Sequence, residues 1–147
     1  MNTAPHRLQE VASEEELSAC FDLMRQLRPH LADSQELRAR WRLQQSEGYR
    51  LWALFEAGRP VALAGFRVQN NLVHGRFLYV DDLVTDQSLR SAGHGARLMA
   101  ELKQEAARLA CAKLVLDTPL ANALGQRFYF RQGLLASALR FNTPIAA

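Results

Sequence analysis

The chain has 147 residues, of which 48% are hydrophobic and 22% are charged, and its formal net charge is +3 at pH 7. This length suits one ordinary domain with a single core, and no repeat or Gly/Ser/Pro-rich stretch divides it, so we expect one domain over residues 1–147. The positive charge is scattered arginine, without a lysine-rich run or interleaved aromatic side chains. That distribution argues against a nucleic-acid partner.

The sequence also argues against export, a membrane and a metal. Its start lacks the apolar core of a signal peptide, and no window holds the roughly 18 apolar residues needed to cross a bilayer. We therefore expect a cytoplasmic protein with no membrane partner. Cys20 and Cys111 belong to no Cys-x-x-Cys motif, so we expect both to be reduced, buried thiols. The histidines show no metal-ligand spacing along the chain; they are His6, His30, His74 and His94.

A short strand and two helices are predicted at the start of the chain. The strand lies around residues 8–11. Ser13, followed by three glutamates, provides a cap and an acidic first turn for a helix that ends before Pro29. Asp33 or the serine after it can cap a second helix, which stops near Gly48.

The next part of the chain changes to strand-like patterns. Residues 49–55 and 61–68 predict an antiparallel hairpin with its turn over 56–60. Residues 72–84 are long and apolar enough for a central strand, which carries Asp81 and Asp82 near its end.

Helical and strand patterns alternate again in the last third. A helix from Gly95 to Leu109 precedes a short buried strand over 113–116, and this order implies a parallel crossover. Residues 121–131 predict one more helix, and 134–141 a last strand. The whole order predicts a mixed α/β fold with a mostly antiparallel central sheet flanked by helices.

The most informative segment lies between the central strand and the helix that follows it. It consists of Arg90-Ser91-Ala92-Gly93-His94-Gly95-Ala96. Glycines at alternate positions let the backbone curl so that consecutive N–H groups face one point, and the helix adds the positive end of its dipole. The segment therefore predicts an anion cradle suited to a pyrophosphate.

Two other phosphate-binding motifs fit this segment less well. A nucleotide P-loop requires Gly-Lys-Ser or Gly-Lys-Thr, whereas Gly95 is followed by alanine and arginine. A dinucleotide fingerprint requires a third glycine where Leu98 stands, and its glycines should directly follow a strand. The glycines could also form no more than a tight strand-to-helix connection.

Two segments resemble motifs of the GNAT acetyltransferase family. Asp81-Asp82-Leu83-Val84-Thr85, followed by Arg90 to Gly95, is similar to motif A, whose signature is Arg/Gln-x-x-Gly-x-Gly/Ala. Asn122, followed seven residues later by Tyr129, is similar to motif B. The resemblance covers roughly residues 49–141 and implies a GNAT-like fold that uses acetyl-CoA as co-substrate.

The resemblance also implies where the cofactor binds. Its pyrophosphate would contact the loop amides, with Arg90 at the signature's basic position; the assigned loop residues are Ser91, Ala92, Gly93, His94, Gly95 and Ala96. The backbone of Leu83, Val84 and Thr85 would resemble the splayed or bulged family strand that pairs with the pantetheine arm. Asn122 would contact the cofactor or only cap its helix.

The catalytic residues follow from the same resemblance and from the chemistry of amide formation. Tyr129 would be the general acid that protonates the departing thiolate, because tyrosine remains protonated at neutral pH. A carboxylate would help to remove the proton of the amine, with Asp81 as first choice, Asp82 as second, and water as a further possibility. Adjacent strand residues point to opposite faces, so we expect only one of these acids to face the cleft.

We therefore expect an N-acetyltransferase that moves the acetyl group of acetyl-CoA to a primary amine by direct attack. The acceptor, a small amine, an amino acid or a protein amine, is not identified by any motif. Five arginines on the first two helices could favour an acceptor carboxylate, but a solvated face is the preferred interpretation; they are Arg25, Arg28, Arg38, Arg40 and Arg42. A non-catalytic acyl-CoA sensor is the alternative function, and exposed edge strands are compatible with a homodimer.

Overall fold

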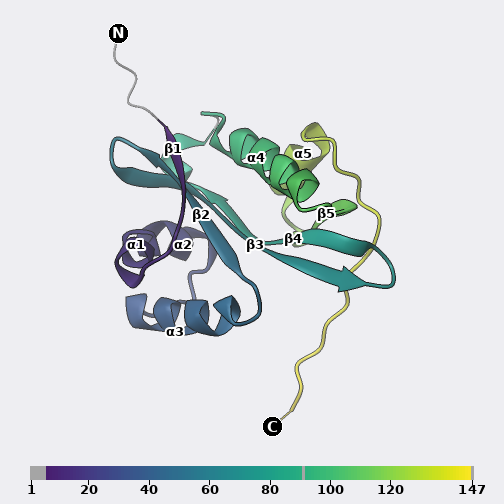
Figure 1. The fold of residues 1–147 in the computed structure, drawn as a ribbon, viewed down its shortest axis with the longest axis horizontal. Helices are drawn as coiled ribbons and strands as arrows, with labels where there is room; N and C mark the ends of the chain where they lie inside the picture. Colours follow the sequence, from purple (N-terminus) through teal and green to yellow (C-terminus); the bar gives the residue numbers. More distant parts are fainter. Residues whose placement is uncertain (1–5, 91, 147) are drawn as a thin grey trace. The chain divides into compact units, whose positions relative to one another are not determined.

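The computed structural model describes residues 6–90 and 92–146 (Figure 1). They form two compact units, one that ends at Leu116 and one that begins at Asp117. The elements of the first unit are β1 (Arg7–Glu10), α1 (Glu14–Ala19), α2 (Phe21–Leu27), α3 (Ser34–Gln45), β2 (Arg50–Glu56), β3 (Arg59–Asn71), β4 (Gly75–Thr85), the 3₁₀ turn η1 (Gln87–Leu89), α4 (His94–Arg108) and β5 (Lys113–Leu116). The second unit contains α5 (Ala123–Arg131).

The five strands of the first unit form one sheet in the order β1-β2-β3-β4-β5. All neighbouring strands are antiparallel except β4 and β5, which are parallel and joined through α4. The expected mixed, mostly antiparallel sheet is thereby confirmed. β2 and β3 are joined by the two-residue turn Ala57-Gly58, in which both residues have positive φ, at 52° and 79°. Such turns match the twist of the flanking strands.

Helices cover both faces of this sheet (Figure 1). Along β2, Leu51 and Ala53 belong to a core shared with α1, α2 and α3, whereas Trp52 and Leu54 belong to a second core shared with α4. Side chains alternate across a strand, so a strand covered on both sides is apolar without interruption. The apolar run of β2 is explained by this arrangement.

The first predicted helix is divided into two. α1 ends and α2 begins at Cys20, whose φ of −92° and ψ of −3° leave the regular helix. Ser13 caps α1 as expected, because its side chain accepts a hydrogen bond from the backbone N–H of Glu16. No proline or glycine precedes the break, so the sequence gives no sign that the helix is interrupted here.

The second unit contains a helix but not the predicted strand. Gly133, with a φ of 87°, follows the end of α5, as predicted. Residues 134–141 form no strand, and Leu135 and Phe141 are 85% and 88% exposed. The prediction was wrong because this segment lacks a strict alternation of apolar and polar residues, and a strand requires a hydrogen-bonded neighbour.

No helix in the described part of the chain is long and apolar enough to cross a bilayer. Both cysteines are free thiols, with Cys20 buried and Cys111 partly buried. Burial and the nearby Glu16 carboxylate raise the pKa of the Cys20 thiol to about 12. Cys20 is therefore an unreactive core residue, as expected.

Candidate active site

The glycine segment leads into α4 in the conformation that an anion site needs. Gly93 occupies the cap position with a φ of 85°, a left-handed conformation that side chains disfavour, and α4 begins at the next residue. The first intrahelical hydrogen bond runs from the N–H of Arg97 to the carbonyl of Gly93 (3.0 Å). The N–H groups of His94, Gly95 and Ala96 therefore precede the helical hydrogen-bonding pattern. Together with the helix dipole, they can bind an anion.

The motif A resemblance implied that the residues before Gly93 offer free backbone N–H groups to an anion, but not all of them do. The N–H of Ala92 donates to the carbonyl of Leu89 (3.2 Å), so it is already engaged within the loop. Arg90 has an extended backbone and an exposed side chain, which leaves its guanidinium available to an anion. Ser91 lies outside the described residues.

β4 carries a bulge where the two acids lie. Gly65 of β3 pairs with Asp82, but the next residue of β3, Phe66, pairs with Val80, so Asp81 is inserted between two regular pairs. β5 accompanies β4 only as far as Val80. Beyond that point residues 83–85 pair with β3 on one side, and no described strand pairs with their other edge. A strand edge of this kind can add an extended ligand.

Both acids line one cavity of about 440 Å³ on the side of the sheet that α1, α2 and α3 cover. The expectation that only one of them would face a cleft was wrong. It assumed regular alternation, and the bulge at Asp81 interrupts that alternation. Leu37, Trp41 and Leu51 supply apolar wall to the same cavity. The cavity therefore combines an apolar surface with two carboxylates.

Asp81 is held by a single arginine. The guanidinium of Arg67 donates to both of its carboxylate oxygens, at 2.6 and 3.0 Å. Burial raises the pKa of Asp81, and the Arg67 hydrogen bonds oppose that rise without cancelling it. A raised pKa makes this carboxylate a stronger base than an exposed aspartate.

Asp82 is held by two residues that lie next to different elements, one just after α2 and one just before β2. Arg28, just after α2, donates to its Oδ1 through Nε (3.0 Å), and the Tyr49 hydroxyl donates to its Oδ2 (2.8 Å). Burial, and then the Asp82 charge, raise the pKa of Tyr49 well above its usual range, so the hydroxyl keeps its proton. Arg28 therefore contacts a carboxylate of the site, whereas the preferred interpretation of the five arginines expected it only to face solvent. Arg42 contacts neither acid in the described contacts and instead forms an ion pair with Glu14.

Sequence analysis did not find Tyr49, Arg67 or Gly65 as parts of this site. A Cβ atom on Gly65 would lie 1.9 Å from the Tyr49 hydroxyl oxygen and 2.5 Å from the ring carbon that bears it. Only glycine lets the Tyr49 ring cross the sheet here to reach Asp82. Glycine inside an otherwise apolar strand often marks close approach of another group, so Gly65 was a usable signal.

The two residues of the motif B resemblance lie in the second unit. Tyr129 is on α5 beside Phe128, with ring centroids 5.3 Å apart, and burial raises its pKa. The Asn122 side chain accepts from the N–H of Gly125 (3.1 Å) and donates to the Thr118 hydroxyl (3.0 Å). Asn122 is therefore the cap of α5, as one of the two interpretations of this residue expected.

Comparison with known proteins agrees with this architecture. Residues 13–134 match the acetyltransferase (GNAT) family. The uncharacterized N-acetyltransferase YhdJ of Bacillus subtilis (strain 168) is 27% identical over 139 residues, which cover 94% of this chain and 98% of that protein.

Solved structures show the same fold. The aminoglycoside N-acetyltransferase AAC(6')-Iy in complex with CoA superposes with a TM-score of 0.85 at 15% identity, covering 99% of this chain and 98% of the other. An acetyltransferase of Trypanosoma brucei has a TM-score of 0.79 at 23% identity, covering 96% and 100%. The chain belongs to the acetyltransferase (GNAT) family and is an N-acetyltransferase by class.

Proposed function

We propose that this protein transfers the acetyl group of acetyl-CoA to a primary amine by direct attack, with residues 1–147 acting as one domain. The observation that carries the proposal is the bulge in β4. It directs Asp81 and Asp82 into one cavity while the following residues keep one strand edge without a described partner. A strand that offers carboxylates to an amine and backbone groups to an extended cofactor suits this reaction.

In this proposal the cofactor binds along the end of β4 and at the start of α4. The pantetheine arm pairs with the backbone of Leu83, Val84 and Thr85, and one amide there polarises the thioester carbonyl. The pyrophosphate binds the N–H groups at the start of α4, with Arg90 as a nearby cation. The AAC(6')-Iy structures contain CoA or a CoA bisubstrate analogue, which supports CoA as the ligand of this fold.

The acceptor amine binds in the cavity, with its nitrogen near Asp81 or Asp82. Loss of its proton to a carboxylate, directly or through water, gives the neutral nucleophile, and attack on the carbonyl carbon forms the new C–N bond. The C–S bond then breaks, and Tyr129 donates its proton to the departing thiolate. The attacking nitrogen loses a second proton to solvent, which gives the neutral amide, and the Tyr129 phenolate and the carboxylate return to their starting protonation states by exchange with solvent. The raised pKa of Tyr129 keeps that proton in place at neutral pH.

Calorimetric titration with acetyl-CoA, CoA and NAD tests the cofactor, and thiol release in the presence of polyamines, amino acids and lysine peptides tests the reaction. We expect acetyl-CoA to bind and thiol release to depend on an amine. Tyr129→Phe should lower kcat by roughly 100-fold and leave the acetyl-CoA affinity within about twofold. Binding without turnover on any amine would favour an acyl-CoA sensor, and no acetyl-CoA binding would overturn the proposal.

A further inference from the structure

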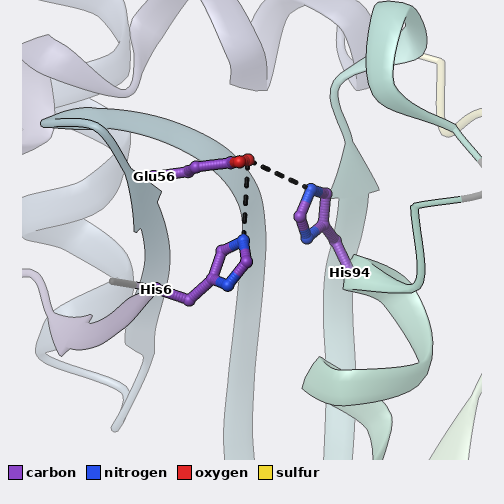
Figure 2. A group of neighbouring side chains, drawn as sticks. All are labelled: His6, Glu56 and His94. Atoms are coloured by element: carbon purple, nitrogen blue, oxygen red, sulfur yellow. Dashed lines mark ion pairs between the residues drawn. The ribbon is translucent and has the colours of Figure 1, made fainter. Parts of the chain in front are cut away.

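Two histidines and a glutamate from three separate elements meet beside the start of α4. His6 immediately precedes β1, Glu56 ends β2, and His94 is the first residue of α4. Figure 2 shows both imidazole rings pointing toward the Glu56 carboxylate. The Nε2 atoms of the two histidines each lie 3.6 Å from the same oxygen, Oε2 of Glu56. The three candidate ligand atoms all lie within 4.8 Å of one another.

The Nε2 atom of the buried His94 has no hydrogen-bond partner in the described part of the chain. His94 is only 6% exposed, and its Nε2 makes no hydrogen bond there, since its nearest carboxylate oxygen is 3.6 Å away. An unpaired buried polar atom destabilises the folded state, so such atoms are rare in folded proteins. The nitrogen nevertheless points at a carboxylate and a second imidazole. A group that lies between the three side chains could therefore bind the His94 Nε2 atom.

We propose that His6, Glu56 and His94 bind a zinc ion. Two imidazole nitrogens and one carboxylate oxygen form a well-known zinc ligand set, with water or another ligand as the fourth. Ligand atoms of a tetrahedral zinc lie roughly 3.4 Å apart, because Zn–N and Zn–O bonds are about 2.0–2.2 Å long. The two separations of 3.6 Å therefore need only small side-chain movements to close around the ion. Zinc would then supply the partner that the His94 nitrogen lacks.

The spacing of these ligands along the chain gives no sign of the site, which is why sequence analysis predicted no metal. The fold brings them together in two steps. Arg7 pairs with Phe55 in the β1–β2 ladder, which places His6 beside Glu56. α4 covers the face of the sheet opposite α1–α3 and adds His94 from its first turn.

The site does not depend on the proposed acetyl transfer. It uses the His94 side chain, whereas the proposed cofactor loop uses the backbone N–H of that residue. A bound zinc would join β1, β2 and α4 at one point, so it should raise the thermal unfolding temperature of the protein by mass action.

The test uses full-length protein without a histidine tag, freed of metal with a chelator. After incubation with zinc and dialysis, elemental analysis should find one zinc per chain. Cobalt should give a visible absorption band of a nitrogen- and oxygen-coordinated ion, a readout that is independent of enzyme activity. His6→Gln and Glu56→Gln should each weaken zinc binding by more than about 100-fold, the upper end of what loss of a supporting residue outside the ligand set costs.

His74→Gln is the matched control, because His74 lies outside the cluster and near Phe77. It should keep the zinc content, the cobalt spectrum and the zinc-dependent rise in unfolding temperature. His6 is 37% exposed, so His6→Gln should fold normally, and circular dichroism checks this. Wild-type protein that retains no zinc, or a folded His6→Gln variant that retains as much as wild type, would overturn the proposal.

Discussion

Asp81 and Asp82 are neighbours in the chain but are held by different cations. Arg67 binds both oxygens of Asp81, whereas Arg28 and Tyr49 each bind one oxygen of Asp82. Burial raises the pKa of Asp81, which favours this carboxylate as a proton acceptor. Asp82, through Arg28 and Tyr49, ties α2 and β2 to the bulge. We therefore propose Asp81 as the proton acceptor and a positioning role for Asp82.

The substitutions Asp81→Asn and Asp82→Asn separate these roles. If Asp81 is the base, Asp81→Asn should lower kcat by roughly 100-fold and remove the acidic limb of the pH–rate profile. Asp82→Asn should keep that limb, since Asp81 remains, and should lower the unfolding temperature because Arg28 loses its ionic partner. Steady-state kinetics as a function of pH checks the acidic limb in both variants, and thermal unfolding checks the stability of Asp82→Asn. An unchanged profile in Asp81→Asn would assign proton removal to Asp82 or to water.

Gly65 is required because the Tyr49 ring crosses directly over it. Gly65→Ala would place a Cβ atom 1.9 Å from the Tyr49 hydroxyl oxygen, so the ring must move and release Asp82. Overpacking of this kind costs about 1–3 kcal/mol, and urea unfolding measures it. In a Tyr49→Ala background the same substitution should cost much less. Equal costs in the two backgrounds would contradict the steric explanation.

At the scale of elements, α4 ends in a left-handed residue that is not glycine. Ala110 has a φ of 58°, and its N–H bonds to the carbonyl of Ala107 (3.1 Å) while the N–H of Cys111 bonds back to Ala106 (2.8 Å). This pair of bonds is the Schellman motif, whose left-handed position favours glycine. The strand β5 begins three residues after Ala110, so the turn sets the direction of the parallel crossover.

Ala110→Gly should therefore stabilise the protein. Relief of the left-handed conformation exceeds the extra freedom of glycine in the unfolded chain, and we expect a gain of about 0.5–1 kcal/mol. Ala107→Gly is the matched control, because Ala107 is exposed within α4 and the same change there should cost about 1 kcal/mol. Denaturant unfolding of both variants should give opposite signs. A loss of stability in Ala110→Gly would contradict the strain argument.

Elements with a local signal could be predicted from the sequence, whereas those that depend on distant contacts could not. The cap at Ser13, Gly58 in the hairpin turn and the glycine before α4 are each of a residue type that their backbone position favours. The break at Cys20 and the missing strand over 134–141 have no such residue. The bulge at Asp81 has only the indirect signal of Gly65. The acids of the candidate site were predictable, but the partners that hold them were not.

At the scale of the first unit, a chain of charges connects the sheet to the helix layer. Arg50 on β2 donates to Glu10 on β1 (2.6 Å) and to Glu105 on α4 (2.6 Å), and Arg108 also donates to Glu105 (2.7 Å). The Arg50 guanidinium lies over the Phe66 ring, 4.9 Å from its centroid. Arg50 lies 40 positions from Glu10 and 55 from Glu105 in the chain, so no local pattern predicts these two contacts, whereas Arg108 and Glu105 are a local pair three residues apart on α4. The network joins β1, β2 and α4, which are far apart in the sequence.

The network makes stability depend on pH through Glu105. Hydrogen bonds from Arg108, and then from Arg50, lower the pKa of Glu105 from 4.5 to about 2. Above about pH 4.5 the carboxylate is ionised in both folded and unfolded chains, so its stabilising contribution is complete. Between pH 4.5 and about 2 the unfolded chain binds a proton that the folded chain does not, and the contribution is lost as the pH falls.

Glu105→Gln should therefore be less stable than wild type at pH 7, and the difference should shrink as the pH falls from 4.5 toward 2. We expect a difference of the order of 1 kcal/mol at pH 7, because Arg108 is largely exposed and solvent screens its charge. Urea unfolding of both proteins at several pH values measures this difference. Glu10 and Asp81 are present in both proteins, so subtracting one free energy of unfolding from the other removes their contributions to the pH dependence. Glu101→Gln, one turn earlier on α4, is the control and should keep the wild-type pH dependence in this window. A Glu105→Gln difference that stayed constant down to pH 2 would show that the arginines do not hold this carboxylate in its ionised form.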